Sequence, residues 1–311
     1  MVHEHVNPPA PPREPEPLII RPPTEAHSLL IRVTRGCKWN RCKFCGIYTH
    51  FGQPEFEVRP LEQIKADILA AREIYGADQR AAFLGDADPL VIDPDDMCRV
   101  LALLRDTFPS LDRITCYARA STCWVRREHL ARFRQSGLSR LHVGLETGSD
   151  DLLRFHRKGV DRRTLISSGK AARQSGIELS YYVLLGLGGS DRCEGHIQQT
   201  LAVLNAVQPE FVRFRRLWIF GSEDGPRCPL WEDVQQGRFT PQTPEGTVHE
   251  MRAIISGIEF PAEIEAIHSN VFVPLKGALP KARIRLLSKI DGFLALPAEH
   301  RRARYSRPSV I

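Results

Sequence analysis

The feature that most constrains the fold is a regular alternation between short apolar segments and amphipathic helical segments. Segments rich in aliphatic and β-branched residues predict strands, at 29–33, 81–84, 113–118, 140–146, 177–185 and 211–219. Helical periodicity and capping signals predict helices at 61–75, 94–108, 126–135, 161–175 and 196–207. Strands that alternate with helices pair in parallel, because each helix returns the chain to the same edge of the sheet. The pattern therefore predicts an α/β fold, a partial (β/α)6 barrel of the TIM type.

The segments that flank this predicted barrel differ from it in composition. Eight prolines occur among the first 23 residues, so we expect 1–28 to be a proline-rich, extended leader. The barrel is expected to cover 29–220. Prolines interrupt the pattern beyond it, so 221–311 is predicted to be a C-terminal extension of mixed structure that closes the open side of the barrel and selects the substrate. Four polar positions in the extension could contact a substrate, although a lone histidine in such a stretch is more often structural: His268, Ser269, Asn270 and Lys276.

Cys37, Cys42 and Cys45 lie within nine residues, directly after the first predicted strand. Thiolates this close together, on a loop that leaves a strand, favour a soft metal centre. A structural zinc site or an electron-transfer cluster takes four protein ligands, so three cysteines leave one coordination position open for another molecule.

Two other interpretations of the three cysteines are a zinc ribbon with a distant fourth ligand and a set of buried thiols. A zinc ribbon draws on a second closely spaced ligand pair. The remaining cysteines contain no such pair, and they are scattered at Cys98, Cys116, Cys123, Cys193 and Cys228. Burial is disfavoured because charged residues, among them Lys38 and Arg41, stand between the three cysteines.

The cysteine loop resembles the cluster loop of the radical SAM superfamily, including the aromatic Phe44 before the last cysteine. Four residues separate the first two cysteines, where the usual family motif has three. The resemblance covers about 29–220 and points to single-cluster, cobalamin-independent members related to the oxygen-independent coproporphyrinogen oxidase-like branch. It implies that Cys37, Cys42 and Cys45 hold a 4Fe–4S cluster whose open iron binds S-adenosylmethionine (SAM).

The turn after the second predicted strand stands where the family has a glycine-rich turn that holds the amino group of SAM. It consists of Gly85, Asp86, Ala87 and Asp88, so only the first glycine of the family turn is present. The resemblance implies contacts between this turn and SAM. An acidic turn that caps the next helix is the alternative interpretation.

Glu146, at the end of the fourth predicted strand, matches the family position that hydrogen-bonds the SAM ribose. A carboxylate that accepts from vicinal hydroxyls suits this role. Glu146 shares a strand face with His142 and Gly144, because side chains alternate along a strand, and the opposite face is expected to pack against helices. The alternative is that Glu146 lies in the capping region of the following helix.

The resemblance implies further contacts with SAM from three other loops. Lys158 stands where related enzymes place a cation against the SAM carboxylate, although a solvated surface lysine is also compatible with the sequence. Tyr117 and Arg119 share a face at the end of the third predicted strand and could reach the cofactor. Gly186 and Gly188 follow the fifth strand, where the family uses a turn near the adenine, although glycines also simply end strands.

The family chemistry that this resemblance implies is radical formation from SAM. An electron from a reductant such as flavodoxin or ferredoxin enters the cluster, and SAM is cleaved to methionine and a 5′-deoxyadenosyl radical that abstracts hydrogen from the substrate. We expect a small-molecule substrate, with tetrapyrrole-like and other anionic compounds among the candidates. The alternatives are the same chemistry on RNA or a protein, with the basic tail at 301–307 for docking, and a non-catalytic zinc or iron–sulfur protein.

The net charge of +6 does not by itself indicate a nucleic-acid partner. Basic residues are spread along the chain, and the sequence contains no basic stripe interleaved with aromatics. No apolar run approaches the roughly 20 residues that cross a bilayer. The first residues do not resemble a signal peptide, and clustered cysteines favour a reducing compartment. We therefore expect a cytoplasmic protein that does not bind membranes, with a nucleic-acid partner as the less favoured alternative.

Overall fold

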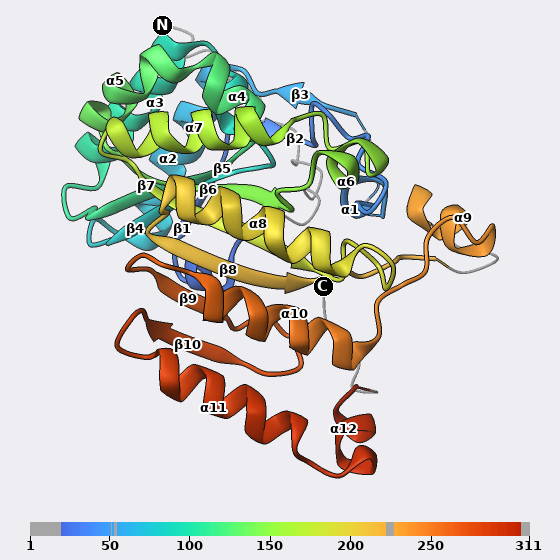
Figure 1. Ribbon diagram of the computed structural model, residues 1–311. Helices are drawn as coiled ribbons and strands as arrows, with labels where there is room; N and C mark the ends of the chain where they lie inside the picture. Colours follow the sequence, from blue (N-terminus) through green and yellow to red (C-terminus); the bar gives the residue numbers. More distant parts are fainter. Residues whose placement is uncertain (1–19, 51, 53–54, 222–226, 306–311) are drawn as a thin grey trace, which may run out of the picture.

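The computed structural model describes residues 20–50, 52, 55–221 and 227–305, so most of the predicted leader lies outside the described residues. An eight-stranded sheet organises the chain (Figure 1), in the order β1-β4-β5-β6-β7-β8-β9-β10. Its strands are β1 (Leu29–Arg32), β4 (Ala81–Gly85), β5 (Arg113–Ala118), β6 (Leu138–Glu146), β7 (Glu178–Leu185), β8 (Phe211–Arg216), β9 (Glu263–Ala266) and β10 (Leu275–Ala278). Neighbours from β1 to β9 are parallel, whereas β10 is antiparallel to β9. The predicted α/β fold with a partial barrel is confirmed.

Helices connect the strands, and the longer ones cover the outer face of the sheet (Figure 1). The helices between β1 and β9 are α1 (Ile47–His50), α2 (Leu61–Tyr75), α3 (Pro94–Thr107), α4 (Ala120–Val125), α5 (Leu130–Ser136), α6 (Asp150–Phe155), α7 (Arg162–Gln174), α8 (Cys193–Val207), α9 (Pro229–Gln235) and α10 (Pro244–Gly257). After β10 come α11 (Arg283–Leu294) and α12 (Ala298–Tyr305). Short 3-10 helices are η1 (Pro23–Glu25), η2 (Pro89–Val91) and η3 (Arg127–His129). A small antiparallel pair, β2 (Thr34–Arg35) and β3 (Glu57–Val58), flanks the cysteine loop.

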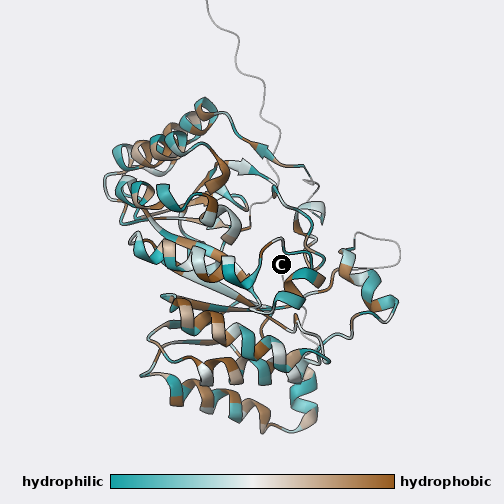
Figure 2. Ribbon diagram, turned by 45° about the horizontal axis from the view of Figure 1, so that its top comes forward, coloured by the Kyte–Doolittle hydropathy of each residue, from teal (hydrophilic) through white to brown (hydrophobic). Residues whose placement is uncertain are grey.

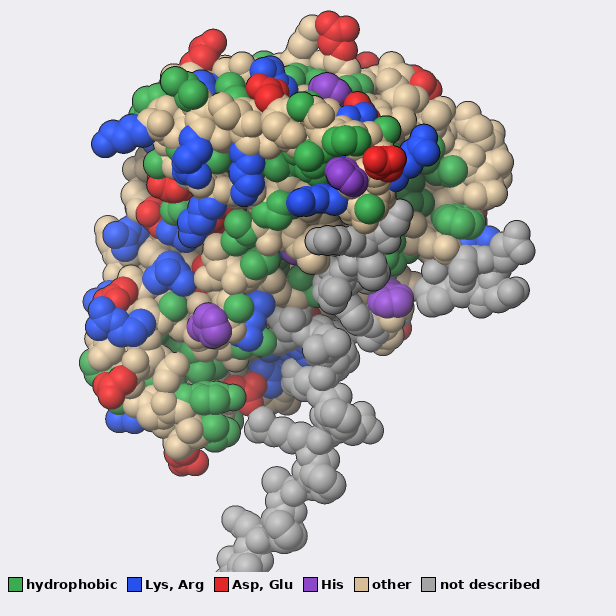
Figure 3. Space-filling model, turned by 90° about the horizontal axis from the view of Figure 1, so that it is seen from below, with side chains coloured by type: hydrophobic (Ala, Val, Ile, Leu, Met, Phe, Trp, Pro, Cys, Tyr) green, Lys and Arg blue, Asp and Glu red, His purple; other side chains and the backbone are tan. Residues whose placement is uncertain are grey.

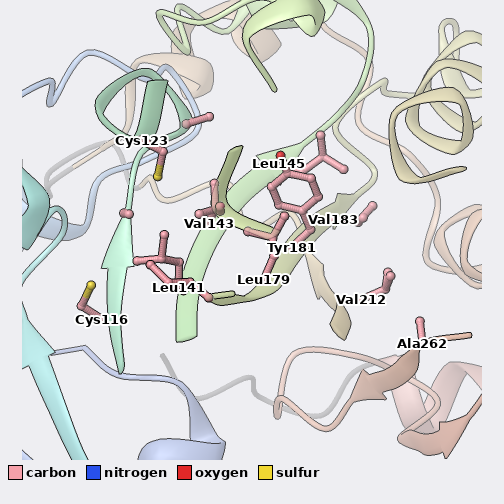
Figure 4. Close-up of a cluster of buried hydrophobic side chains, with 14 of the residues drawn as sticks. Cys116, Cys123, Leu141, Val143, Leu145, Leu179, Tyr181, Val183, Val212 and Ala262 are labelled. Carbon is pink, nitrogen blue, oxygen red and sulfur yellow. The ribbon is translucent and has the colours of Figure 1, made fainter. Parts of the chain in front are cut away.

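The main core lies between the outer face of the sheet and these helices. Leu141, Val143 and Leu145 of β6 are fully buried there, as the alternation along this strand predicted. Figure 4 shows them beside Tyr181 of the neighbouring β7. The Tyr181 hydroxyl is also buried and donates a hydrogen bond to the Leu165 carbonyl on α7, at 2.6 Å. Figure 2 shows hydrophobic residues recurring along the helices that cover the sheet. The opposite face of β6 carries His142, Gly144 and Glu146, which line a cavity.

The C-terminal part extends the same sheet beyond the six predicted parallel strands. β9 pairs in parallel with β8, and β10 then adds an antiparallel edge. The sequence analysis missed β9 because its inward side chains are charged. Glu265 on this strand forms an ion pair with Arg213 of β8 at 2.9 Å, so the segment lacks the continuous apolar run that marks a buried parallel strand.

Two features near the N-terminus of the described chain differ from the expected extended leader. Residues 23–25 form η1, and Glu25 is fully buried. Its carboxylate is compensated by Arg113, at 3.1 Å, and by a hydrogen bond with His142 at 3.3 Å. Because buried carboxylates need such partners, this segment packs against the inner face of the sheet.

Basic, acidic and hydrophobic side chains all occur on the face of the molecule seen in Figure 3. Of the basic tail, Arg301 is tied to the fold, because it donates hydrogen bonds to the Leu294 and Leu296 carbonyls. Among the described helices, none combines the length and the apolar character needed to span a membrane.

Candidate active site

A cavity of about 330 Å³ opens toward the carboxyl ends of the parallel strands. Its walls come from the cysteine loop after β1 and from the ends of β5, β6, β7 and β8. Ligands of parallel barrels bind at this end of the strands. The cavity brings together eight of the predicted site residues: Cys37, Cys42, Cys45, Ala87, Tyr117, Arg119, Glu146 and Lys158.

The cysteine loop begins at Gly36, whose backbone φ of +74° is in the left-handed region. Its N–H donates to Asp86 Oδ2 at 3.1 Å, and a Cβ at this position would overlap the Glu55 carbonyl oxygen. Asp86 is itself held by Arg32, with Nε to Oδ1 at 3.3 Å. The backbone N–H of Asp86 donates to Thr34 Oγ1 at 3.2 Å. In this structure, Asp86 therefore anchors the start of the loop.

The other predicted residues of this turn also support the frame around the cavity. The Gly85 carbonyl accepts a hydrogen bond from the Val33 N–H at 2.7 Å. Asp88 is fully buried and accepts from Thr122 Oγ1 at 2.5 Å and from the Arg119 N–H at 3.3 Å. Burial raises the pKa of Asp88 to about 6, although these hydrogen bonds oppose the shift. Asp88 thus binds the start of α4, and only Ala87 of the turn reaches the cavity.

A second set of contacts ties the cysteine loop to the segment after α6. The Trp39 indole N–H donates to the Arg157 carbonyl at 2.7 Å. Arg119 lies with its guanidinium carbon 4.9 Å from the centre of the Trp39 ring, and it donates to the Lys158 carbonyl at 2.8 Å. A Cβ on Gly159 would overlap the same ring. These contacts fix the position of Lys158 relative to the three cysteines.

The three thiols fit a multi-iron cluster. Burial raises the pKa of Cys42, although the nearby cations of Lys158 and Arg119 oppose the shift. Burial also raises the pKa of Cys45, to about 12. Metal binding would therefore displace protons from these thiols. All three line one cavity, yet within the described ranges no three His, Cys, Asp or Glu side chains converge on a point that could hold a single ion. Thiols spread around a cavity suit a cluster in which each thiolate binds a different iron.

Glu146 and Lys158 form an ion pair in the cavity, with Lys158 Nζ 2.7 Å from Glu146 Oε1. Burial alone would lower the pKa of Lys158, but the Glu146 carboxylate raises it above its usual value, so the lysine is charged. Gly144, two residues before Glu146 on β6, leaves the space that the pair occupies. The predicted shared face of His142, Gly144 and Glu146 is confirmed, since all three line the cavity.

The structure does not bring Gly186 and Gly188 into this cavity. Gly186, at φ +84°, lines a neighbouring cavity of about 390 Å³, and its N–H donates to Glu250 Oε2 at 2.6 Å. Gly188 packs closely, because a Cβ there would lie 2.8 Å from the Arg192 carbonyl oxygen. The two cavities share three residues of the wall after β8: Arg216, Leu217 and Trp218.

Sequence reasoning did not assign several residues of the cavity wall, among them Tyr182, Arg215, Trp218 and Phe220. Their position in the sequence could have identified them as cavity residues, because they lie on or directly after the fifth and sixth predicted strands. His268 and Asn270 of the C-terminal extension do reach the cavity. Lys276 does not line it, and its exposed ammonium group lies 3.6 Å from Glu265 Oε1.

The fold and this site define a partial α/β barrel protein with a three-cysteine centre at the carboxyl ends of its strands. Residues 31–200, more than half of the chain, match the sequence model of the Radical SAM superfamily. The chain belongs to the radical SAM superfamily, as the cysteine loop predicted. Membership implies a 4Fe–4S cluster and SAM as cofactors.

Comparison with individual proteins adds one curated relative. The heme chaperone HemW of Bacillus subtilis (strain 168) is 23% identical over 217 residues, which are 68% of this chain and 55% of HemW. The match thus spans about half the length of that relative. The similarity to HemW supports the predicted relation to the coproporphyrinogen oxidase-like branch.

Two solved structures illustrate the likeness of the fold. Methylornithine synthase (PylB) aligns with a TM-score of 0.52 and 17% identity, over 85% of this chain and 68% of PylB. An N-terminally truncated Elp3 of the archaeon Methanocaldococcus infernus aligns with a TM-score of 0.52 and 14% identity, over 86% of this chain and 62% of that chain. At these identities the likeness concerns the fold alone.

Proposed function

We propose that this protein is a radical SAM enzyme that reductively cleaves SAM at a 4Fe–4S cluster and abstracts hydrogen from a small-molecule substrate. Cys37, Cys42 and Cys45 would hold the cluster. The observation that carries the proposal is that these three thiols and the Glu146–Lys158 pair line one cavity. When bound, cluster and SAM together would supply a 5′-deoxyadenosyl radical as the hydrogen acceptor.

Glu146 and Lys158 are the residues that we assign to SAM. Lys158 offers a cation to the carboxylate of SAM, and Glu146 can accept hydrogen bonds from the ribose hydroxyls. In this structure the charges of the two residues neutralise each other, with Lys158 Nζ 2.7 Å from Glu146 Oε1. Binding of SAM would exchange this ion pair for two contacts with the ligand. Arg119 acts as a positioning residue, because it holds the Lys158 carbonyl and the Trp39 ring.

The remaining wall of the cavity serves to exclude water and competing hydrogen donors. Much of it is apolar or aromatic, with Phe44, Leu184, Leu217 and Phe220 among the lining residues. Phe44 is held edge-on against His156, with ring centres 5.7 Å apart. A reactive species formed in such a site meets few groups other than the bound substrate.

We propose that a small acidic electron carrier such as flavodoxin or ferredoxin delivers the electron. Lys38 and Arg41 are exposed and lie between the three cysteines. Basic groups around the cluster loop would steer an acidic partner to it, since complementary charge raises the association rate. The Lys38→Glu/Arg41→Glu double variant should then slow reduction by flavodoxin while leaving reduction by dithionite unaffected.

The direct test is anaerobic reconstitution with iron and sulfide, followed by dithionite and SAM, with chromatographic detection of 5′-deoxyadenosine. We expect product from the native protein and from Cys98→Ala, which removes a cysteine of α3 outside the loop. Cys42→Ala should form none. A native protein that takes up neither cluster nor SAM would refute the proposal.

A second candidate is heme handling without SAM cleavage, and the similarity to the heme chaperone HemW over 68% of this chain favours it. Titration with hemin, followed by the Soret absorbance, tests this candidate. Saturable hemin binding by a reconstituted protein that forms no 5′-deoxyadenosine would favour it. Formation of 5′-deoxyadenosine without hemin binding would favour the radical enzyme.

A further inference from the structure

We propose that Arg215 and Tyr182 bind a carboxylate group of the substrate, on the wall of the cavity that β7 and β8 form. The inference rests on the proposed function, because it concerns the molecule from which hydrogen would be removed. It assigns the class of that molecule as a small carboxylate with a flat apolar part.

The first observation is the charge of Arg215. Two arginines, Arg213 and Arg215, alternate on the same face of β8. Arg213 pairs with Glu265 of β9 at 2.9 Å. Arg215 has no such partner, because the residue two positions after Glu265 is the apolar Ile267. Among the residues that the structure describes, no carboxylate lies within 4.0 Å of Arg215. A guanidinium in a largely apolar cavity is stabilised by an anionic partner, so the site lacks an anion.

The second observation is the hydroxyl of Tyr182, a residue that is only 7% exposed. The guanidinium carbons of Arg213 and Arg215 lie 5.9 and 5.5 Å from the centre of its ring. Guanidinium groups only donate hydrogen bonds, so neither arginine can accept the hydroxyl hydrogen. The two arginines can only donate to its oxygen, and among the described residues no acceptor lies within hydrogen-bond distance of this buried hydroxyl. It is therefore a donor in need of an acceptor.

The two donors are placed side by side by the strand register. Tyr182 pairs with Arg213, and Leu184 pairs with Arg215, so Tyr182 and Arg215 are diagonal neighbours on the inner face. Together they present one positive charge and one hydroxyl donor. This combination matches the single charge and two acceptor oxygens of a carboxylate.

The surroundings define the rest of the ligand. Trp218 and Phe220 stack with ring centres 5.6 Å apart and an interplanar angle of 10°, and both line the cavity. Flat apolar groups pack well on such rings. Arg215 stands on β8, whereas the cysteine loop follows β1 and Glu146 ends β6, so the proposed carboxylate site uses none of the residues that we assign to cluster and SAM.

The test compares 3-phenylpropanoate with its neutral isostere 3-phenylpropanamide, by calorimetry on the reconstituted full chain with SAM present. We expect the native protein to bind the carboxylate at least tenfold more tightly than the amide. Arg215→Met should abolish this preference, Arg215→Lys should restore part of it, and Tyr182→Phe should reduce it severalfold. Arg99→Met, which removes one positive charge from the exposed side of α3, should keep it.

Equal affinity for both probes, or binding of neither, would overturn the proposal. It would also be overturned if Arg215→Met kept the preference for the carboxylate, and a loss of affinity for SAM in that variant would mean that Arg215 serves the cofactor instead. Tyr182→Phe keeps the test decisive if the arginine variants fail to fold. A carboxylate preference in a protein that forms no 5′-deoxyadenosine would retain this site and refute the proposed function instead.

Discussion

Lys158 Nζ lies 2.7 Å from Glu146 Oε1, and the contact exists because residue 144 has no side chain. A Cβ at Gly144 would overlap Glu146 Oε1 and lie 2.9 Å from Lys158 Nζ. The two residues that we assign to SAM therefore depend on a glycine of the same strand face. The obstructed atoms are the ends of two flexible side chains, so the site can be disturbed without disturbing the fold.

Gly144→Ala should thus weaken SAM binding while leaving the protein folded. We expect the dissociation constant for SAM to rise at least tenfold, because the added methyl group displaces both charged ends. The free energy of unfolding should change by about 1 kcal/mol or less, since only side-chain ends must move. Equilibrium dialysis with SAM and urea unfolding measure the two quantities. An unchanged affinity for SAM would show that neither residue contacts it.

Acid should destabilise the protein through the buried pair of His142 and Glu25. Burial lowers the pKa of His142 to about 4. Burial would raise the pKa of Glu25, but hydrogen bonds from His142 and Ser28 lower it to about 2. Both groups therefore bind protons more readily in the unfolded chain. Stability should fall as the pH drops from about 6.5 to 4 through His142, and from about 4.5 to 2 through Glu25.

The variant His142→Gln isolates the histidine contribution, because its amide can still donate to Glu25. Between pH 7 and 5 the unfolding free energy of the native protein should fall by about 2 kcal/mol more than that of the variant. The reason is that only a chain that contains His142 takes up a proton at this imidazole when it unfolds. Urea unfolding at the two pH values measures the difference. Equal losses in both proteins would mean that His142 is not held neutral.

The sequence could predict the parts of the fold that carry a regular period. The alternation in β6 correctly separated Leu141, Val143 and Leu145, which pack on helices, from Gly144 and Glu146, which face the cavity. The cysteine loop could be recognised because its chemistry is local, with all three thiols in one short segment. Both signals depend on neighbours along the chain.

The parts that the sequence did not reveal depend on contacts between distant segments. Asp86 could not be distinguished as a loop anchor without knowing that Arg32 and Gly36 surround it. The strand β9 was hidden because Glu265 is buried only through its pairing with Arg213. In each case a charged residue occupies a buried position that its type alone does not indicate.

Gly36→Ala should damage the cysteine loop specifically. Gly36 and Gly76 have the same φ of +74°, but a Cβ at 36 overlaps the Glu55 carbonyl, whereas a Cβ at 76 has open space. Gly76→Ala should cost about 1–3 kcal/mol for the backbone alone, because φ +74° with ψ −179° is a conformation that essentially only glycine adopts. Gly36→Ala should cost more and also lower the iron content after reconstitution. Iron and sulfide analysis of both variants tests this, and equal iron contents would contradict the inference that Gly36 shapes the loop.

The C-terminal part should control how firmly the loop retains its cluster, through Asp233 at the end of α9. Its carboxylate, which is almost fully buried, accepts from Lys43 Nζ at 2.8 Å and from Arg238 Nε at 2.7 Å. Lys43 lies between Cys42 and Cys45 in the cysteine loop, and its carbonyl accepts a hydrogen bond from the Leu230 N–H at 2.9 Å. Asp233→Asn keeps the shape but removes the charge, at a cost of about 2 kcal/mol for hydrogen bonds to a charged group. We expect the reconstituted variant to lose iron to a chelator severalfold faster than the native protein.

Asp291→Asn, which breaks an exposed ion pair with Arg252, is the matched control. It should lose iron at the native rate, because exposed ion pairs contribute little to stability. Equal rates for all three proteins would mean that α9 does not hold the loop.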